Sequence, residues 1–166
     1  SSDLYVTNQR DQAVLTNLAK HHPGVQILAK QGIANANDGE VVASALITQH
    51  PDIQAIYAPW DSIAEGVVAA TRAAGRSDIK VITMDLGAAN ALDMAKGRNV
   101  AGIVTDLPYD LGQTLATMGA LAKLGEQTPP FVTVSADAVT RDNLADAWQQ
   151  ALRRDPPAAV TKALSQ

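Results

Sequence analysis

The stretch IQAIYA-PWDS-IAEGVVAATRAAG, residues 53–75, holds a strand, a turn and a helix in direct succession. Residues 53–58 are mostly apolar, too few for an independent helix and bounded by prolines, which predicts a short buried strand. Beyond the turn, apolar residues recur at helical spacing. Ser62 and Glu65 have the spacing of a capping box, and Gly75 lies where a helix commonly ends. The sequence therefore predicts a strand that passes directly into a helix.

The turn between these two elements contains an aromatic residue beside a carboxylate, Trp60 and Asp61, directly after Pro59. In an open α/β sheet such turns lie at the carboxyl ends of the strands, which is where ligands bind. This turn is therefore the first candidate for a functional site.

The same alternation continues in both directions along the chain. Further strands are predicted at residues 25–30, 79–84, 100–105 and 131–135, and further helices at 8–22, 37–50, around 91–95, 111–124 and 144–152. Strands that alternate with helices form βαβ units. We therefore predict an α/β fold with a doubly wound parallel sheet and helices on both faces.

The predicted order begins with a helix, because residues 3–6 are short and half polar and do not predict a strong strand. A doubly wound sheet ordinarily starts with a strand. We therefore expect that the first strand lies upstream of this chain, and that a targeting segment could lie there too, since the chain starts with Ser1 in place of a methionine.

The composition excludes several classes of function. The chain has 166 residues, 46% of them hydrophobic and 18% charged, which is typical of a globular domain. A net charge of −4 without a basic run argues against nucleic-acid binding. There is no cysteine, no apolar run long enough for a membrane span, and no Walker, Gly-x-Ser-x-Gly or His-Glu-x-x-His motif. We therefore expect that the protein is not an enzyme and that it binds no metal and no cofactor.

Polar residues follow the ends of several predicted strands and should meet at one edge of the sheet. The candidates for ligand binding are Trp60, Asp61, Asp85 and Asp106, together with Arg10, which would join this edge if a strand upstream preceded the first helix. Carboxylates accept hydrogen bonds from hydroxyl groups, an arginine donates to oxygens, and a tryptophan covers an apolar C–H face. This set of groups predicts a pocket for a neutral polyhydroxylated molecule.

Each candidate also has a structural alternative. Asp61 stands where an exposed helix cap stands, and this role is favoured for it. Trp60 could be a core residue, Asp106 could end a strand, and Arg10 could belong to a solvated helix face. For Asp85 a ligand contact is favoured, since it follows an apolar strand.

Several spaced motifs resemble the second half of ribose-type sugar-binding proteins of ABC transporters, the type I periplasmic binding protein family. The motifs are residues 50–66 (HPDIQAIYAPWDSIAEG), 73–75 (AAG), 79–85 (IKVITMD), 104–112 (VTDLPYDLG) and 139–144 (VTRDNL). They occur in the family's order and extend over nearly all of the chain. In that family two α/β lobes close on a sugar and deliver it to a membrane permease without chemistry.

The resemblance implies a division of the chain between lobes. Residues 1–107 with 130–140 would form the second, C-terminal lobe without its first strand. Residues 108–129 would be a helix that packs on the absent first lobe, and 141–166 would be a C-terminal helix and tail. The chain would cross between the lobes near residues 106–107 and 129–130.

The resemblance also implies roles for the candidate residues. Arg10, Asp61 and Asp85 match residues of the family pattern, and the arginine and the aspartate after the strand contact the sugar there. Trp60 stands in place of an asparagine and Asp106 in place of a glutamine. These departures favour a sugar other than ribose, or a polyol.

The leading hypothesis is a periplasmic, monomeric solute-binding protein that carries a monosaccharide or polyol to an ABC permease and binds no nucleic acid. The alternative is the effector-binding domain of a LacI-type regulator, which shares the fold and would be revealed by an upstream helix-turn-helix. A third hypothesis is an α/β enzyme or phosphoacceptor that uses Asp85.

Overall fold

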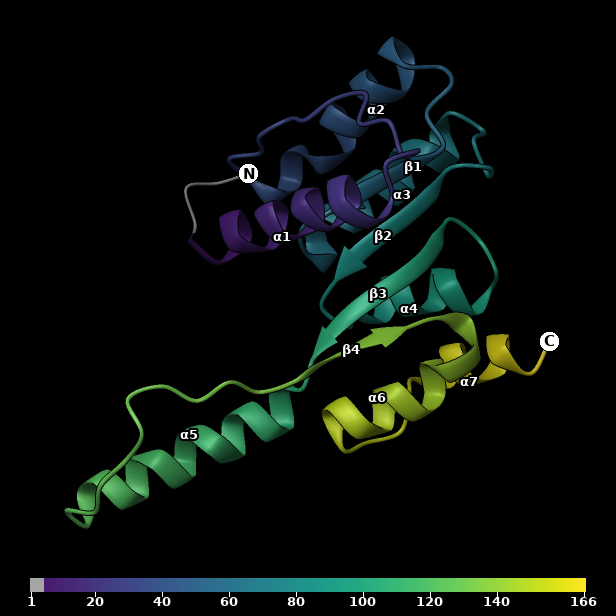
Figure 1. Cartoon of the computed structure of the whole chain (residues 1–166). Helices are drawn as coiled ribbons and strands as arrows, with labels where there is room; N and C mark the ends of the chain where they lie inside the picture. The colour runs from purple at the N-terminus through teal and green to yellow at the C-terminus, as the bar shows by residue number, and fades with distance from the viewer. Residues whose placement is uncertain (1–4) are drawn as a thin grey trace.

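The computed structural model describes residues 5–166, and Figure 1 shows their arrangement. The α-helices are α1 (Tyr5–His21), α2 (Gly39–Gln49), α3 (Asp61–Ala73), α4 (Ala88–Ala95), α5 (Pro108–Lys123), α6 (Leu144–Leu152) and α7 (Ala158–Leu164). The strands are β1 (Ala55–Ala58), β2 (Lys80–Met84), β3 (Val100–Asp106) and β4 (Ala136–Val139). Two short 3-10 helices, η1 (Ala36–Asp38) and η2 (Arg141–Asn143), precede α2 and α6. Residues 3–6 do not predict a strong strand, and two of them, Asp3 and Leu4, lie outside the described residues.

The strands form one sheet in the order β1-β2-β3-β4. The first three strands are parallel and are connected through α3 and α4, while β4 pairs with β3 in the antiparallel direction. The predicted α/β class and the parallel sheet are confirmed. The antiparallel strand at one edge was not predicted.

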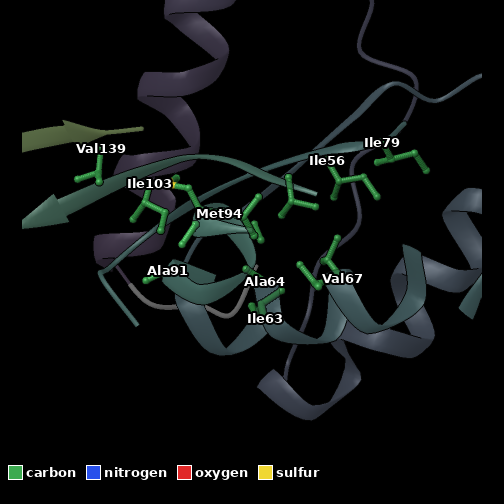
Figure 2. Close-up of a cluster of buried hydrophobic side chains, with 14 of the residues drawn as sticks. Ile56, Ile63, Ala64, Val67, Ile79, Ala91, Met94, Ile103 and Val139 are labelled. Atoms are coloured by element: carbon green, nitrogen blue, oxygen red, sulfur yellow. The ribbon is translucent and has the colours of Figure 1, made fainter. Parts of the chain in front are cut away.

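One face of the sheet packs against α3 and α4 and forms the hydrophobic core. Alternate strand residues such as Ile56, Val81 and Ile103 are buried, because successive side chains of a strand point to opposite faces. Figure 2 shows how Ile56 and Ile103 meet helix residues such as Ile63 and Met94 between the sheet and the helices. The spacing of the apolar residues in 53–75 thus produces the buried face of α3.

Helix α2 covers the outer side of α3 at very close range. A Cβ on Gly66 would lie 2.6 Å from the backbone nitrogen of Glu40, and one on Gly39 would lie 2.9 Å from the carbonyl oxygen of Ile63. Two glycines therefore allow the two backbones to approach, which side chains would prevent.

The opposite face of the sheet is covered by α1, which crosses in front of β1 and β2 in Figure 1. The predicted placement of helices on both faces is therefore correct. Helix α1 covers this face incompletely, and Ile82 of β2 stays exposed there.

The predicted strand at residues 25–30 is wrong. The segment is extended but pairs with no strand, and Val25 and Ile27 are exposed, although Leu28 packs against the core. In the described part of the chain β1 pairs with β2 alone. An apolar alternation forms a strand only where another strand supplies hydrogen bonds, and residues 25–30 have none beside them.

The predicted strand at residues 131–135 is also displaced. The strand is Ala136–Val139, and Phe131 is 80% exposed. The last pair of the β3–β4 ladder joins Asp106 to Ala136. Residues 131–135 therefore lie beyond the end of β3 and have no strand to pair with.

Two helix details also differ from the expectation. Helix α3 begins at Asp61, with Trp60 at its N-cap, so Ser62 and Glu65 do not form the predicted capping box. The tail contains α7, whose Val160 and Ala163 join the core and which packs beside α4. The proline pair before α7 and the apolar spacing within it were the signal for this helix.

Candidate ligand-binding site

The carboxyl ends of the three parallel strands bring together residues that are far apart in the sequence. The turn after β1 contains Pro59 and Trp60, Asp85 follows β2, and Asp106 is the last residue of β3. Parallel strands end at the same edge of a sheet. This edge is the candidate site.

Arg10 of α1 joins these strand ends. Its Nη1 donates to the Pro59 carbonyl oxygen at 3.2 Å and to Asp85 Oδ2 at 3.4 Å. Its Nη2 donates to Asp85 Oδ1 at 3.4 Å and to Asp106 Oδ2 at 3.2 Å. One guanidinium therefore contacts the ends of all three parallel strands, and Arg10 does not belong to a solvated helix face.

The charges at this edge are exposed to different degrees. The Arg10 side chain is 18% exposed, whereas those of Asp85 and Asp106 are 37% and 50% exposed. A molecule arriving from solvent therefore meets the carboxylates before it meets the guanidinium.

The backbone of Asp85 adopts a left-handed conformation with φ of 68°. Its N–H donates to the Val104 carbonyl at 2.8 Å, and its carbonyl accepts from the Gly87 N–H at 3.1 Å. Left-handed residues other than glycine are uncommon and gather at functional sites. The turn thus fixes the orientation of the Asp85 side chain at the sheet edge.

The pKa of the Asp85 carboxyl is raised above its ordinary value. Burial is the main cause, and the neighbouring carboxylates of Asp106 and Asp61 add to it, while the Arg10 guanidinium opposes the shift. The long contacts from Arg10 therefore do not compensate fully for the loss of water around this carboxylate.

Asp61 has a structural role in the turn. Its Oδ1 accepts from the Ser62 N–H at 2.7 Å and from the Ser62 hydroxyl at 3.2 Å, and Asn90 donates to its backbone carbonyl at 3.0 Å. A Cβ on Gly87 would lie 2.7 Å from the Asp61 carboxylate. Asp61 supports the start of α3 at this edge, and its carboxylate packs against the turn that carries Asp85.

Trp60 lies at the same edge, directly after the carbonyl that Arg10 binds. It is half-buried and packs against the hydrophobic core, so it combines features of both roles considered for it. Its ring keeps some exposure in a turn beyond the strand, where it can contribute an apolar surface to a ligand.

Sequence reasoning missed two residues beside Arg10. The Tyr57 hydroxyl lies 3.7 Å from the sulfur of Met84, and burial, aided by the negative charge of the nearby Asp11, raises the pKa of Tyr57 to about 12. Tyr57 alternates with the buried Ile56 and Ala58, so strand periodicity already indicated that it faces α1. Together with Asp11, it helps to hold α1 over the sheet.

The described residues offer no sign of a metal centre, since no three His, Asp or Glu side chains in 5–166 are grouped to hold an ion. Shallow hollows occur along α1, next to Gln12 and Thr16, and on α6, next to Gln149. Neither is lined by Arg10, Asp85 or Asp106. The candidate site is therefore defined by the hydrogen-bonding groups of Arg10, Asp85 and Asp106 and does not coincide with either hollow.

Comparison with known proteins gives a consistent result. Residues 2–127 match the family model described as a periplasmic binding protein domain. Over 81 residues the chain is 38% identical to a D-ribose/D-allose-binding protein of Pseudomonas aeruginosa, and the match covers 48% of this chain and 25% of that protein.

Solved structures share the fold. A solute-binding protein of an ABC transporter from Agrobacterium vitis, bound to α-D-tagatopyranose, gives a TM-score of 0.80 at 21% identity over 91% of this chain and 50% of that one. A carbohydrate transporter solute-binding protein from Agrobacterium radiobacter, in complex with D-arabinose, gives 0.78 at 27% identity over 87% of this chain and 50% of that one. The match thus spans half of each of these structures.

No helix within residues 5–166 is long and apolar enough to cross a membrane.

Proposed function

The chain belongs to the periplasmic binding protein domain family, and we propose on that premise that it forms part of the solute-binding component of an ABC transporter. In this proposal it binds a monosaccharide or polyol reversibly in a cleft between two lobes and delivers it to a membrane permease. It acts in the periplasm as a monomer and catalyses no reaction.

The contacts of Arg10 are the observation that carries the proposal. Arg10 gathers Asp85, Asp106 and the turn before Trp60 into one polar rim with an aromatic side chain beside it. Hydroxyl groups of a sugar can donate to the exposed carboxylate oxygens, and an indole ring can cover the C–H face of the same molecule. We therefore propose Arg10, Trp60, Asp85 and Asp106 as ligand-binding residues, with Asp61 supporting the turn that carries Trp60.

Helix α5 supports the proposal that the protein has a first lobe in addition to the lobe formed by this chain. It contains no buried residue, its Leu111 and Leu115 are exposed, and it extends away from the sheet in Figure 1. An apolar stripe of this kind ordinarily packs against another part of a protein. We propose that residues 108–129 pack on a first lobe, which completes the cleft.

That lobe is consistent with the lengths of the relatives, because this chain matches half of each solved structure described above. The comparisons do not favour the alternative of a LacI-type effector domain, since the relatives described above are transporter binding proteins. A gene neighbourhood that encodes a permease and an ATPase would add independent support for delivery to a transporter.

The test is calorimetric titration of the full-length protein with a panel of pentoses, hexoses and their polyols. We expect one or more of them to bind, and the affinity to fall in an Arg10→Ala variant that is shown to be folded under the conditions of the titration. Absence of heat across the whole panel, in protein shown to be folded, would contradict a sugar-binding function.

A further inference from the structure

Given the two-lobe arrangement proposed above, on which this inference rests, we propose that Arg153 is a positioning residue for ligand binding. Arg153 fixes the direction in which α5 leaves the lobe formed by this chain. Because the first lobe is proposed to pack on α5, the same side chain sets the angle between the two lobes, although Arg153 is not one of the proposed ligand-binding residues.

The junction between β3 and α5 leaves the direction of α5 to a few contacts. A single residue, Leu107, separates the last residue of β3 from the first residue of α5. Leu107 is 6% exposed and anchors the junction, whereas α5 itself contains no buried residue and extends away from the sheet (Figure 1). Hinge motions are ordinarily absorbed by a few residues at the ends of such elements. Contacts of the first turn of α5 are therefore what can hold this helix in one direction.

Arg153, directly after α6, supplies two contacts of this kind. Its Nη2 donates to Asp110 Oδ1 at 3.0 Å, and its guanidinium carbon lies 5.3 Å from the centroid of the Tyr109 ring. Both partners belong to the first turn of α5, and among the described elements α5 packs most extensively against α6. A guanidinium that lies over a ring and beside a carboxylate is fixed in distance and in orientation. We call Arg153, Tyr109 and Asp110 the Arg153 clamp.

The backbone of Arg153 points to a role for its side chain. Arg153 is the C-cap of α6 and adopts a left-handed conformation with φ of 52°. Glycine is the usual residue for this conformation at the end of a helix, because a Cβ makes it unfavourable. The contacts with α5 account for an arginine at a position whose backbone favours glycine.

The helix dipole gives a simpler reason for part of this arrangement. An acidic residue such as Asp110 suits the first turn of a helix, and a basic residue such as Arg153 suits a helix C-terminus. The dipole does not account for the contact with the Tyr109 ring or for the left-handed backbone. Arg153 also lies beyond the part of the chain that matches the family model, which ends at residue 127. The clamp is therefore proposed as a feature of this chain.

The first experiment measures the direction of α5 in the full-length protein without ligand. Spin labels on Lys123→Cys, at the end of α5, and on Lys96→Cys, after α4, report the distance between this helix and the lobe by double electron–electron resonance. Both positions are exposed, and this chain has no cysteine that would compete for the label. We expect a narrow distance distribution when Arg153 is present and a broader one in Arg153→Gly. Glycine removes the clamp and suits the left-handed backbone, so α6 should remain folded.

The second experiment is calorimetric titration with the sugar that binds best in the panel above. Arg153→Gly should weaken binding by about two- to tenfold, because the ligand must then also restrict the angle between the lobes. The effect is limited to this size because the side chains of Arg153 and Asp110 are 50% and 33% exposed, and exposed ion pairs are weak. Arg154→Ala, which removes the neighbouring exposed arginine, should change neither the distances nor the affinity.

Further variants attribute the effect to the clamp. Asp110→Asn removes the ion pair and Tyr109→Leu removes the ring, so each should give part of the effect of Arg153→Gly. Arg153→Gly combined with Asp110→Asn should bind no more weakly than Arg153→Gly alone, because the contact between them is already absent. Since Asp110 is partly exposed, Asp110→Asn stays informative even if Arg153→Gly perturbs folding.

The outcomes separate this inference from the proposed function. An unchanged distance distribution in Arg153→Gly and Asp110→Asn would overturn the clamp while sugar binding stands. A broadened distribution with an unchanged dissociation constant would overturn the role of Arg153 in ligand binding. Failure of the wild type to bind any sugar of the panel would overturn the proposed function and that role with it, while the distances without ligand would still decide whether Arg153 positions α5.

Discussion

Two aspartate–arginine pairs of this protein differ in which partner is covered. In the pair of Asp93 and Arg72, the carboxylate is 1% exposed and the guanidinium 51% exposed. In the pair of Asp85 and Arg10 the arrangement is reversed, with the arginine covered and the carboxylate open to solvent. The same two residue types therefore occur in opposite orientations.

Their hydrogen bonds differ in the same sense. Asp93 accepts from Arg72 and from the Val100 N–H at 2.8 Å, so its buried oxygens have partners within the fold. Asp85 is held by contacts of 3.4 Å from Arg10 and keeps accessible acceptor oxygens. A covered carboxylate with complete partners ties α4 to β3, whereas an open carboxylate at a strand end is available to a ligand.

The largest effect is expected when Asp93, the buried member of the first pair, is removed. Asp93→Ala should lower the free energy of unfolding by about 2–4 kcal/mol, because it leaves a buried N–H and a guanidinium without their acceptor. Urea unfolding measures the loss. Asp85→Ala should cost much less stability, and equal losses in the two variants would contradict the distinction between the pairs.

The next effect concerns the arginines. Arg10→Ala should weaken sugar binding by about 1.5–3 kcal/mol, the scale of hydrogen bonds that involve charged groups, and should affect binding more than folding. Arg72→Ala is the matched control and should leave the dissociation constant unchanged in calorimetric titration. A larger loss of stability than of affinity in Arg10→Ala would assign Arg10 a structural role.

Trp60 tests the apolar side of the rim. Trp60→Ala should reduce sugar affinity by about 1–3 kcal/mol, the scale of a buried aromatic contact. Because Trp60 also packs against the core, Trp60→Phe, which keeps an aromatic ring, should recover most of the stability and part of the affinity. An unchanged dissociation constant in Trp60→Ala would mean that this ring serves the core alone.

The smallest effect is a dependence of stability on pH. The folded-state pKa of Asp85 is raised above the ordinary value of 3.8, so the folded protein binds this proton more tightly than the unfolded chain does. Its contribution to stability is present in full below the ordinary value and is lost as the pH rises through the raised pKa. Relative to Asp85→Asn, the wild type should therefore lose stability over that interval of pH. Urea unfolding at a series of pH values measures this loss. Free energies of unfolding that depend on pH in the same way in both proteins would contradict the prediction.

Much of the fold followed from local patterns. The apolar spacing of residues 53–75 predicted β1 and α3, because burial of one helix face and of alternate strand residues leaves a periodic trace in the sequence. The rule that parallel strands end at one edge predicted that Asp85 and Asp106 would meet there, whereas Arg10 was expected at this edge only if an upstream strand preceded its helix. The displaced strands show the limit of such patterns, since residues 25–30 and 131–135 have strand-like composition without a partner strand.

The sequence by itself determined the α/β class, the residues that the carboxyl edge brings together and the resemblance to a sugar-binding family, because periodicity, turn residues and motif order are local properties of the chain. Only the tertiary structure decided that Arg10 is the covered partner and Asp85 the open one, that Asp61 supports a turn, and that Tyr57 and Asp11 lie beside them. Exposure and pairing depend on how α1 lies over the sheet, and no local pattern contains that information.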